Sequence, residues 1–171
     1  PVKIEPETGP PASWVMPYLT TYGRVYVFYD YNGDRFKCPG RSDCVGWFVY
    51  KYSDDHGRTW SKERYRLPMR MTAVDRTNTF GGKVQIFWGI GKPITFDGTM
   101  MFAFSKCGKY LIDRSEGWFY RSDNILTETD PAKIYFTVWV AEGDIPTVSF
   151  GELEQEVVEM TRTWEDRLRD E

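Results

Sequence analysis

The sequence has few of the residues from which metal and redox sites are built. It contains one histidine, His56, and three cysteines among 171 residues, with no Cys-x-x-Cys pair. Because zinc sites are made mainly of Cys and His ligands, we expect no zinc site, and we predict neither a metal nor a cofactor. The acidic residues around Asn32-Gly33 lack the closing Glu of a calcium loop, so a plain turn is expected there. Cys38 and Cys44 could close a small disulfide loop in an oxidising compartment, and two free thiols fit equally well.

The sequence also lacks long apolar runs and an excess of positive charge. No apolar run approaches the roughly 18 residues that span a membrane, and the formal net charge is −3. We therefore expect neither a membrane nor a nucleic-acid partner. The chain begins at Pro1 without a Met and without a signal-peptide pattern. A missing true start is one interpretation, and the residues alone leave the compartment open.

Aromatic residues are abundant at 17%, and with 15 Gly and 10 Pro they indicate many short strands joined by tight turns. Residues 1–13 are Pro-rich and polar and are predicted to form an extended lead-in. Beyond them, alternating or short apolar runs predict strands at 14–20, 24–31, 45–52, 62–67, 83–88, 99–105, 117–121 and 133–140. The fold class is therefore expected to be all-β.

Residues 53–60 form a turn motif directly after an aromatic strand. They match the pattern Ser-x-Asp-x-Gly-x-Thr-Trp at each fixed position. The Asp carboxylate can bond to the backbone amides that follow, the Gly can take a positive φ angle, and the hydroxyl groups add hydrogen bonds. The Trp ring can pin the turn onto the sheet. The residues predicted to build this turn are Ser53, Asp55, Gly57, Thr59 and Trp60.

The motif resembles the Asp-box, the bacterial-neuraminidase (BNR) repeat of sialidases and related β-propellers. Part of the surrounding sequence repeats, because residues 46–54 return as residues 117–123 with two residues deleted and without the Gly-x-Thr-Trp half. A four-stranded unit with the box between its third and fourth strands is what a propeller blade looks like. The resemblance implies two antiparallel β-propeller-like blades within residues 14–150, at about 14–67 and 83–140, out of about six in a complete ring.

Residues 151–171 differ from the strands in character. Their apolar residues recur at spacings of three and four with charges between them, which predicts a C-terminal amphipathic helix. Its apolar positions are Leu153, Val157, Met160, Trp164 and Leu168. Two blades cannot close a ring, so we expect a piece of a larger propeller, or self-association through exposed blade edges or this helix. A free-standing small β-domain is the remaining alternative.

The position of the Asp-box predicts where functional residues lie. In an up-and-down blade the 1–2 and 3–4 turns share one face, and the 2–3 loops and the connections between blades share the other. Loops 31–44, 68–82 and 106–116 should therefore gather on the face opposite to the box. Function often resides on long, charged loops above a rigid scaffold. His56, inside the box, should be dispensable.

Resemblance to sialidases also implies a chemistry: an Arg cluster that clamps a substrate carboxylate, an Asp general acid, and a Tyr–Glu pair as nucleophile and base. An Arg fork matches a carboxylate in bidentate fashion and stays charged. Residues 70–78 hold two arginines and a carboxylate, and the segments 80–85 and 88–93 that follow also look like parts of sialidase-family proteins. We predict Asp75 as the general acid and, as substrate-binding residues, Arg70, Arg76, Asp113, Arg114 and Arg35.

The implied function is that of a sialidase-like glycoside hydrolase, exo-acting on an acidic or polar glycan, in an extracellular or periplasmic setting. The alternative is a non-catalytic Asp-box propeller module that binds a glycan or a protein partner. Turnover of a sialoside separates the two.

Overall fold

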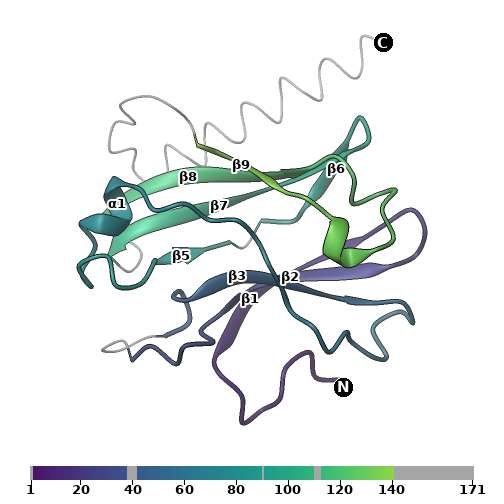
Figure 1. The fold of residues 1–171 in the computed structure, drawn as a ribbon, viewed down its shortest axis with the longest axis horizontal. Helices are drawn as coiled ribbons and strands as arrows, with labels where there is room; N and C mark the ends of the chain where they lie inside the picture. Colours follow the sequence, from purple (N-terminus) through teal and green to yellow (C-terminus); the bar gives the residue numbers. More distant parts are fainter. Residues whose placement is uncertain (1, 38–41, 90, 110–112, 141–171) are drawn as a thin grey trace. The chain divides into compact units, whose positions relative to one another are not determined.

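Two antiparallel β-sheets make up the described part of the chain (Figure 1). The structure, a computed structural model, describes residues 2–37, 42–89, 91–109 and 113–140. All of them belong to a unit that spans Pro1–Ala141. The helix predicted at 151–171 lies outside the described residues, and so does Cys38 of the possible disulfide.

The first sheet is a four-stranded meander in chain order. Its strands are β1 (Ala12–Leu19), β2 (Val25–Tyr31), β3 (Trp47–Ser53) and β4 (Tyr65–Arg66). The β2–β3 ladder is regular, whereas the β1–β2 register shifts between Ser13 and Met16. Trp14 lies in this shift with a positive φ of 58°. A left-handed backbone at a non-glycine residue marks a bulge in the edge strand.

The second sheet has five strands, in the order β5-β7-β8-β9 with β6 also paired to β7. They are β5 (Phe87–Trp88), β6 (Ile94–Phe96), β7 (Thr99–Lys109), β8 (Asp113–Ser122) and β9 (Thr137–Val140). Because β5 and β6 pair with the two ends of β7, they act together as one interrupted first strand. Two short helices, α1 (Ala73–Arg76) and the 3₁₀ turn η1 (Pro131–Lys133), lie in the connections.

The expected all-β class is confirmed, but the loop predicted at 106–116 is wrong. Most of this stretch is strand, because β7 continues to Lys109 and β8 begins at Asp113. Lys106 follows Phe102 and Phe104 on the buried face of β7 and is itself fully buried. Its charge suggested a loop, yet the charge is compensated inside the protein. Strand β6 was not predicted; it comes after the turn expected at 89–93.

Aromatic side chains on the facing surfaces of the two sheets form the main core. The rings of Phe28 and Phe48 in the first sheet lie 4.9 and 5.6 Å from the ring of Phe102 in the second. Trp118 and Tyr120 of β8 are fully buried in the same cluster. Burial of a large apolar side chain contributes about 2–3 kcal/mol. Packing between the two sheets is therefore the main stabilising feature.

The first strands of the two sheets lie side by side. The hydroxyl of Tyr18 on β1 lies 2.6 Å from Oγ1 of Thr95 on β6. Farther along, the rings of Trp14 and Trp88 pack edge to face with their centroids 5.3 Å apart. The two sheets therefore meet along their first strands as well as face to face.

The N-terminal segment covers part of the outer face of the first sheet, where the sequence predicted only an extended lead-in. Ile4 packs against the apolar cluster formed by Val27, Tyr29 and Val49, and the Tyr29 hydroxyl donates a hydrogen bond to Glu5. Burial acts to raise the pKa of Glu5, but hydrogen bonds and nearby positive charges outweigh it and lower that pKa below its usual value. The lead-in is therefore part of the packed fold.

Candidate functional site

Connecting segments from both sheets gather at one end of the unit, which we call the loop end. It comprises residues 32–37 and 42–46, residues 67–86, and the strand ends at the β7–β8 junction. Phe36 packs edge-on against Phe80, with ring centroids 5.2 Å apart, and the N–H of Thr79 donates to the Gly108 carbonyl at 2.9 Å. Figure 1 shows α1 at this end. The hairpin turn at 53–61 lies at the other end of β3.

The segment that joins β4 to α1 crosses the second sheet (Figure 1). Three side-chain hydrogen bonds fasten it there. The hydrogen bonds run from Tyr120 Oη to the Pro68 carbonyl (2.7 Å), from Lys106 Nζ to the Arg70 carbonyl (2.6 Å) and from Thr72 Oγ1 to Glu116 Oε2 (2.8 Å). Every partner on the sheet side comes from β7 or β8. The path of this segment is therefore set by side chains of the second sheet.

Lys106 and Asp75 form a buried ion pair under this segment. Neither side chain has exposed surface, and the Lys106 ammonium donates to Oδ2 of Asp75. The same oxygen accepts the backbone N–H of Thr72 at 2.7 Å, at the start of α1. Oδ1 of Asp75 has no hydrogen-bond partner among the described residues. Burial lowers the pKa of Lys106, and the contact with Asp75 opposes that shift.

Arg70 is the exposed cation of this cluster. Its guanidinium carbon lies 5.3 Å from the centroid of the Trp118 ring, and the Lys106 ammonium lies 4.9 Å from the same ring. The Trp118 indole N–H donates to the carboxylate of Glu116 at 3.1 Å. An exposed guanidinium and a half-buried carboxylate thus lie around one indole. Such a set can bind a ligand that carries an anionic group and hydroxyls.

Asp75, the predicted general acid, does not reach the surface in this structure. A general acid must come within hydrogen-bond distance of the atom that it protonates, whereas the Asp75 side chain is 0% exposed and paired to Lys106. The geometry therefore argues against a proton transfer from Asp75 to a substrate. It favours a structural role, in which Asp75 fixes the start of α1 and neutralises Lys106.

The structure does not join the other predicted substrate-binding residues to Arg70 by any described contact. Arg76 is exposed at the C-terminal end of α1. Arg35 is exposed with a φ of 50° and donates to a carbonyl of the N-terminal segment at 3.4 Å. Arg114 is exposed in β8 with a φ of 46°, next to Asp113 at the start of that strand. Among the described residues no hydrogen bond or ring contact links these three arginines to Arg70.

Lys106, Glu116 and Trp118 were not among the site residues predicted from the sequence, although Lys106 and Glu116 were noted as charged residues of the loop expected at 106–116. Lys106 and Glu116 are directly paired across β7 and β8, although both were assigned to a loop. The available signal was strand alternation, because Lys106 continues the inward-facing series begun by Phe102 and Phe104. A strand that ends in a buried Lys also requires an acceptor elsewhere in the fold.

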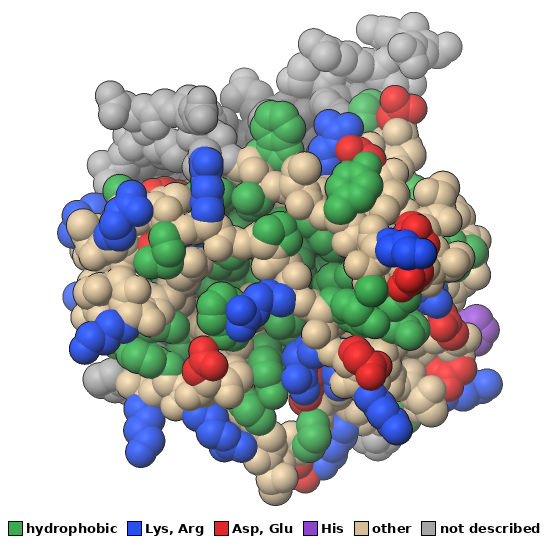
Figure 2. Space-filling view, viewed as in Figure 1, with side chains coloured by type: hydrophobic (Ala, Val, Ile, Leu, Met, Phe, Trp, Pro, Cys, Tyr) green, Lys and Arg blue, Asp and Glu red, His purple; other side chains and the backbone are tan. Residues whose placement is uncertain are grey.

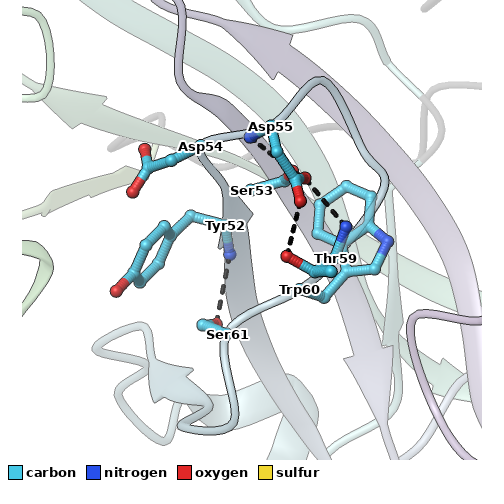
Figure 3. Close-up of a pocket in the computed structure, with 7 residues that line it drawn as sticks. All are labelled: Tyr52, Ser53, Asp54, Asp55, Thr59, Trp60 and Ser61. Atoms are coloured by element: carbon cyan, nitrogen blue, oxygen red, sulfur yellow. Dashed lines mark hydrogen bonds between the residues drawn. The ribbon is translucent and has the colours of Figure 1, made fainter.

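The Asp-box turn makes the hydrogen bonds that its sequence predicts (Figure 3). Asp55 accepts from the N–H and hydroxyl of Thr59 at 2.8 and 2.7 Å and from the Ser53 hydroxyl at 2.7 Å. The backbone hydrogen bond from Thr59, followed by the two hydroxyl bonds, lowers the pKa of Asp55 to about 2. Gly57 has a positive φ of 81°. Trp60 packs against the apolar cluster on the outer face of the first sheet.

A shallow hollow of about 290 Å³ lies over this turn. Its lining residues are Tyr52, Ser53, Asp54, Asp55, Thr59, Trp60 and Ser61. Several of their polar groups already bond to one another, and Arg24 holds Asp54 in an ion pair at 2.6 Å. Arg24 also donates to the Thr129 carbonyl at 2.6 Å, which links the turn to the segment between β8 and β9. These contacts favour a scaffold role for this end of the unit.

Five buried polar side-chain atoms of the described residues have no hydrogen-bond partner, and two of them, in Asp75 and Gln85, belong to the loop end. Among the described residues they are Trp14 Nε1, both carboxylate oxygens of Asp30, Asp75 Oδ1 and Gln85 Oε1. Burial, and secondarily the charge of Asp43, raise the pKa of Asp30 well above its usual range. Natural proteins leave few such groups, and those that remain often mark sites of ligand or water binding. None of these atoms belongs to the Asp-box turn.

Comparison with known proteins gives no identification, because no family model and no curated protein matches the chain. Within the described residues no helix is long and apolar enough to cross a membrane. No group of three or more His, Cys, Asp or Glu side chains in the described ranges could hold a metal ion. On the face drawn in Figure 2, acidic and basic side chains are interspersed, with exposed apolar side chains between them.

Proposed function

We propose that the chain is a two-blade part of a sialidase-like glycoside hydrolase and that its loop end binds an acidic or polar sugar. The Asp-box turn supports this proposal, and so do two antiparallel sheets that meet along their first strands. The observation that carries the binding site is the exposed guanidinium of Arg70 beside Trp118, above the buried pair of Lys106 and Asp75. An arginine held in this way is suited to a sugar carboxylate.

Glu116 is the carboxylate of this cluster that is best placed for a ligand. It is half-buried, and its Oε2 accepts from both Thr72 and Trp118. In a glycoside hydrolase Glu116 would be the catalytic carboxylate for the sugar that Arg70 binds. Asp75 would stabilise the segment that joins β4 to α1. The remaining groups of a sialidase-like site would come from further blades.

The outer faces of the two sheets differ in how far they are covered. This difference indicates where a further blade would pack. On the first sheet, Ile4 and Glu5 of the N-terminal segment cover part of the outer face. On the second sheet, Phe119 of β8 and Trp139 of β9 are paired on the outer face and are 41% and 58% exposed. We propose that the second sheet is where another blade, or another copy of this chain, packs.

A non-catalytic Asp-box module that binds a glycan or a protein is the second candidate function. The burial of Asp75 favours it, because the carboxylate that the resemblance assigns as the acid cannot reach a ligand in this structure. In this alternative Arg70 and Glu116 bind without turnover. The two candidates share the binding site and differ only in chemistry.

The test is a fluorogenic sialoside assay together with calorimetric binding of N-acetylneuraminic acid, both on the full chain. We expect Arg70→Ala to lower the affinity at least tenfold. Arg121→Ala is the matched control, because Arg121 is also partly exposed but is paired with Asp123 on the second sheet. Turnover that depends on Arg70 supports the hydrolase, and binding without turnover supports the module. Binding or turnover that is unchanged in Arg70→Ala would refute the proposed site.

A further inference from the structure

We propose that Lys106 is a positioning residue for Arg70, and that the buried Lys106–Asp75 pair fixes the backbone from which the Arg70 guanidinium projects. This inference rests on the proposed binding role of Arg70. It adds a residue that contacts no ligand and acts only through Arg70.

The Lys106 ammonium holds two points of the crossing segment at once. It donates to the Arg70 carbonyl at 2.6 Å and to the carboxylate of Asp75. Asp75 in turn accepts the N–H of Thr72 at 2.7 Å. One buried cation from the middle of the second sheet therefore fastens both Arg70 and the start of α1. The backbone between these points has little freedom to move.

The Trp118 ring restricts the movement of the Arg70 guanidinium. Its ring centroid lies 5.3 Å from the guanidinium carbon of Arg70 and 4.9 Å from the Lys106 ammonium. The ring is fixed because it is fully buried and its N–H donates to Glu116 at 3.1 Å. With its backbone held by Lys106 and its side chain beside a fixed ring, Arg70 loses less conformational entropy when a ligand binds.

Stability alone does not account for the pair. Two charges with 0% exposure are costly to desolvate, and an uncharged pair of similar volume commonly stabilises a fold as well or better. An apolar pair would not, however, donate a hydrogen bond to the Arg70 carbonyl. The hydrogen bond to the Arg70 carbonyl is therefore the contribution of Lys106 that an apolar residue cannot replace.

The test compares the wild-type chain with Lys106→Met and with the double variant Lys106→Met/Asp75→Asn. Lys106→Met should lower the melting temperature strongly, because Asp75 becomes a buried, unpaired charge. The double variant removes that charge and should recover at least half of the loss. If Lys106 only stabilises the fold, recovery of stability should restore the affinity for N-acetylneuraminic acid. If Lys106 positions Arg70, the double variant should stay at least tenfold weaker.

A second measurement follows Arg70 itself by ¹⁵N relaxation of its Nε–H group. We expect a restricted Nε–H in the wild-type chain and a mobile one in the double variant. Wild-type mobility as high as that of a solvated arginine would overturn the proposal without any variant. A stable double variant with a restricted Nε–H and wild-type affinity would overturn it as well.

The two arms separate this inference from the proposed function. If the wild-type chain binds no acidic sugar, the proposed function fails, and the relaxation of Arg70 alone decides whether Lys106 positions it. If the wild-type chain binds and the double variant binds equally well, the proposed function stands and the positioning role of Lys106 is refuted.

Discussion

Glu5 accepts two hydrogen bonds from the guanidinium of Arg64, at 2.7 Å each. The ammonium of Lys51 lies 3.4 Å from the same carboxylate, and the Tyr29 hydroxyl also donates to it. The N-terminal segment is thereby fastened to β2, to β3 and to the residue that precedes β4. A charged anchor of this kind makes a segment that is Pro-rich and polar in sequence an integral part of the fold.

We expect Glu5→Gln to lower the free energy of unfolding by about 2 kcal/mol, because it weakens charge-assisted hydrogen bonds and leaves Lys51 and Arg64 without their anion. Urea unfolding followed by tryptophan fluorescence measures the loss. Glu7→Gln is the control, since Glu7 is 80% exposed and pairs with Lys3; it should change the value by less than about 0.5 kcal/mol. Equal effects of the two changes would mean that the anchor does not stabilise the fold.

Phe48 should be among the most sensitive positions of the core. It is 1% exposed, and its ring centroid lies 5.3–5.6 Å from those of Phe87, Phe102 and Phe104 in the second sheet. Phe48→Ala should cost about 3–5 kcal/mol through lost burial and a cavity between the sheets. Phe119→Ala, at a 41% exposed ring, should cost less than about 1 kcal/mol. Similar costs at the two positions would contradict the face-to-face packing of the sheets.

Asp55 should make the fold sensitive to acid. Its pKa is about 2 in the folded chain against 3.8 for an unperturbed aspartate. The folded state thus favours the ionised form, and the resulting stability is present above about pH 4 and is lost as the pH falls towards 2. Asp55→Asn should remove this part of the pH dependence. Asp97→Asn, in the exposed β6–β7 turn, is the control.

The measurement is the melting temperature of each chain between pH 2 and 7. The melting temperatures of the wild type and of Asp97→Asn should fall in parallel below about pH 4. The melting temperature of Asp55→Asn should be lower at pH 7 and should fall less as the pH decreases. A decline in Asp55→Asn as steep as in the wild type would show that other carboxylates govern the acid response.

The outer face of the second sheet should govern self-association. Phe119 and Trp139 are paired across β8 and β9 and are both exposed, and removing such apolar surface from water favours association. We expect the wild-type sedimentation coefficient to rise with protein concentration and that of Trp139→Ser to stay constant. Val15→Ser, at a 54% exposed position on β1, controls for a general loss of apolar surface. A wild-type chain that remains monomeric at every concentration would exclude this role.

Local rules predicted much of the first sheet. Alternation placed the strands around Phe28 and Phe48, and the fixed positions of the Asp-box predicted the bonds of Asp55 and the positive φ of Gly57. These features depend on a few neighbouring residues, so a single sequence contains their signal. Strand order alone predicted which end of β3 lies opposite to the Asp-box turn, but the third loop expected at that end, 106–116, is mostly strand.

The candidate site was less predictable, because it depends on contacts between distant residues. From the sequence alone Lys106 is predicted to be a loop residue, because its partner, Asp75, lies 31 positions earlier. Asp75 is predicted to be a catalytic acid because the sequence does not show that its side chain is buried. The anchoring of Glu5 by Arg64 across 59 positions is of the same kind. Charge in the sequence marked these residues as important but did not distinguish a buried pair from an exposed site.

The binding of an acidic sugar at the loop end is tested most directly by a titration of the ¹⁵N-labelled chain with N-acetylneuraminic acid, followed by backbone amide chemical shifts. We expect concentration-dependent shifts at the loop end, in residues 69–76 and around Glu116, and no comparable shifts in the Asp-box turn at 53–61. Shifts confined to the Asp-box turn, or no shifts at millimolar ligand, would contradict binding at the loop end.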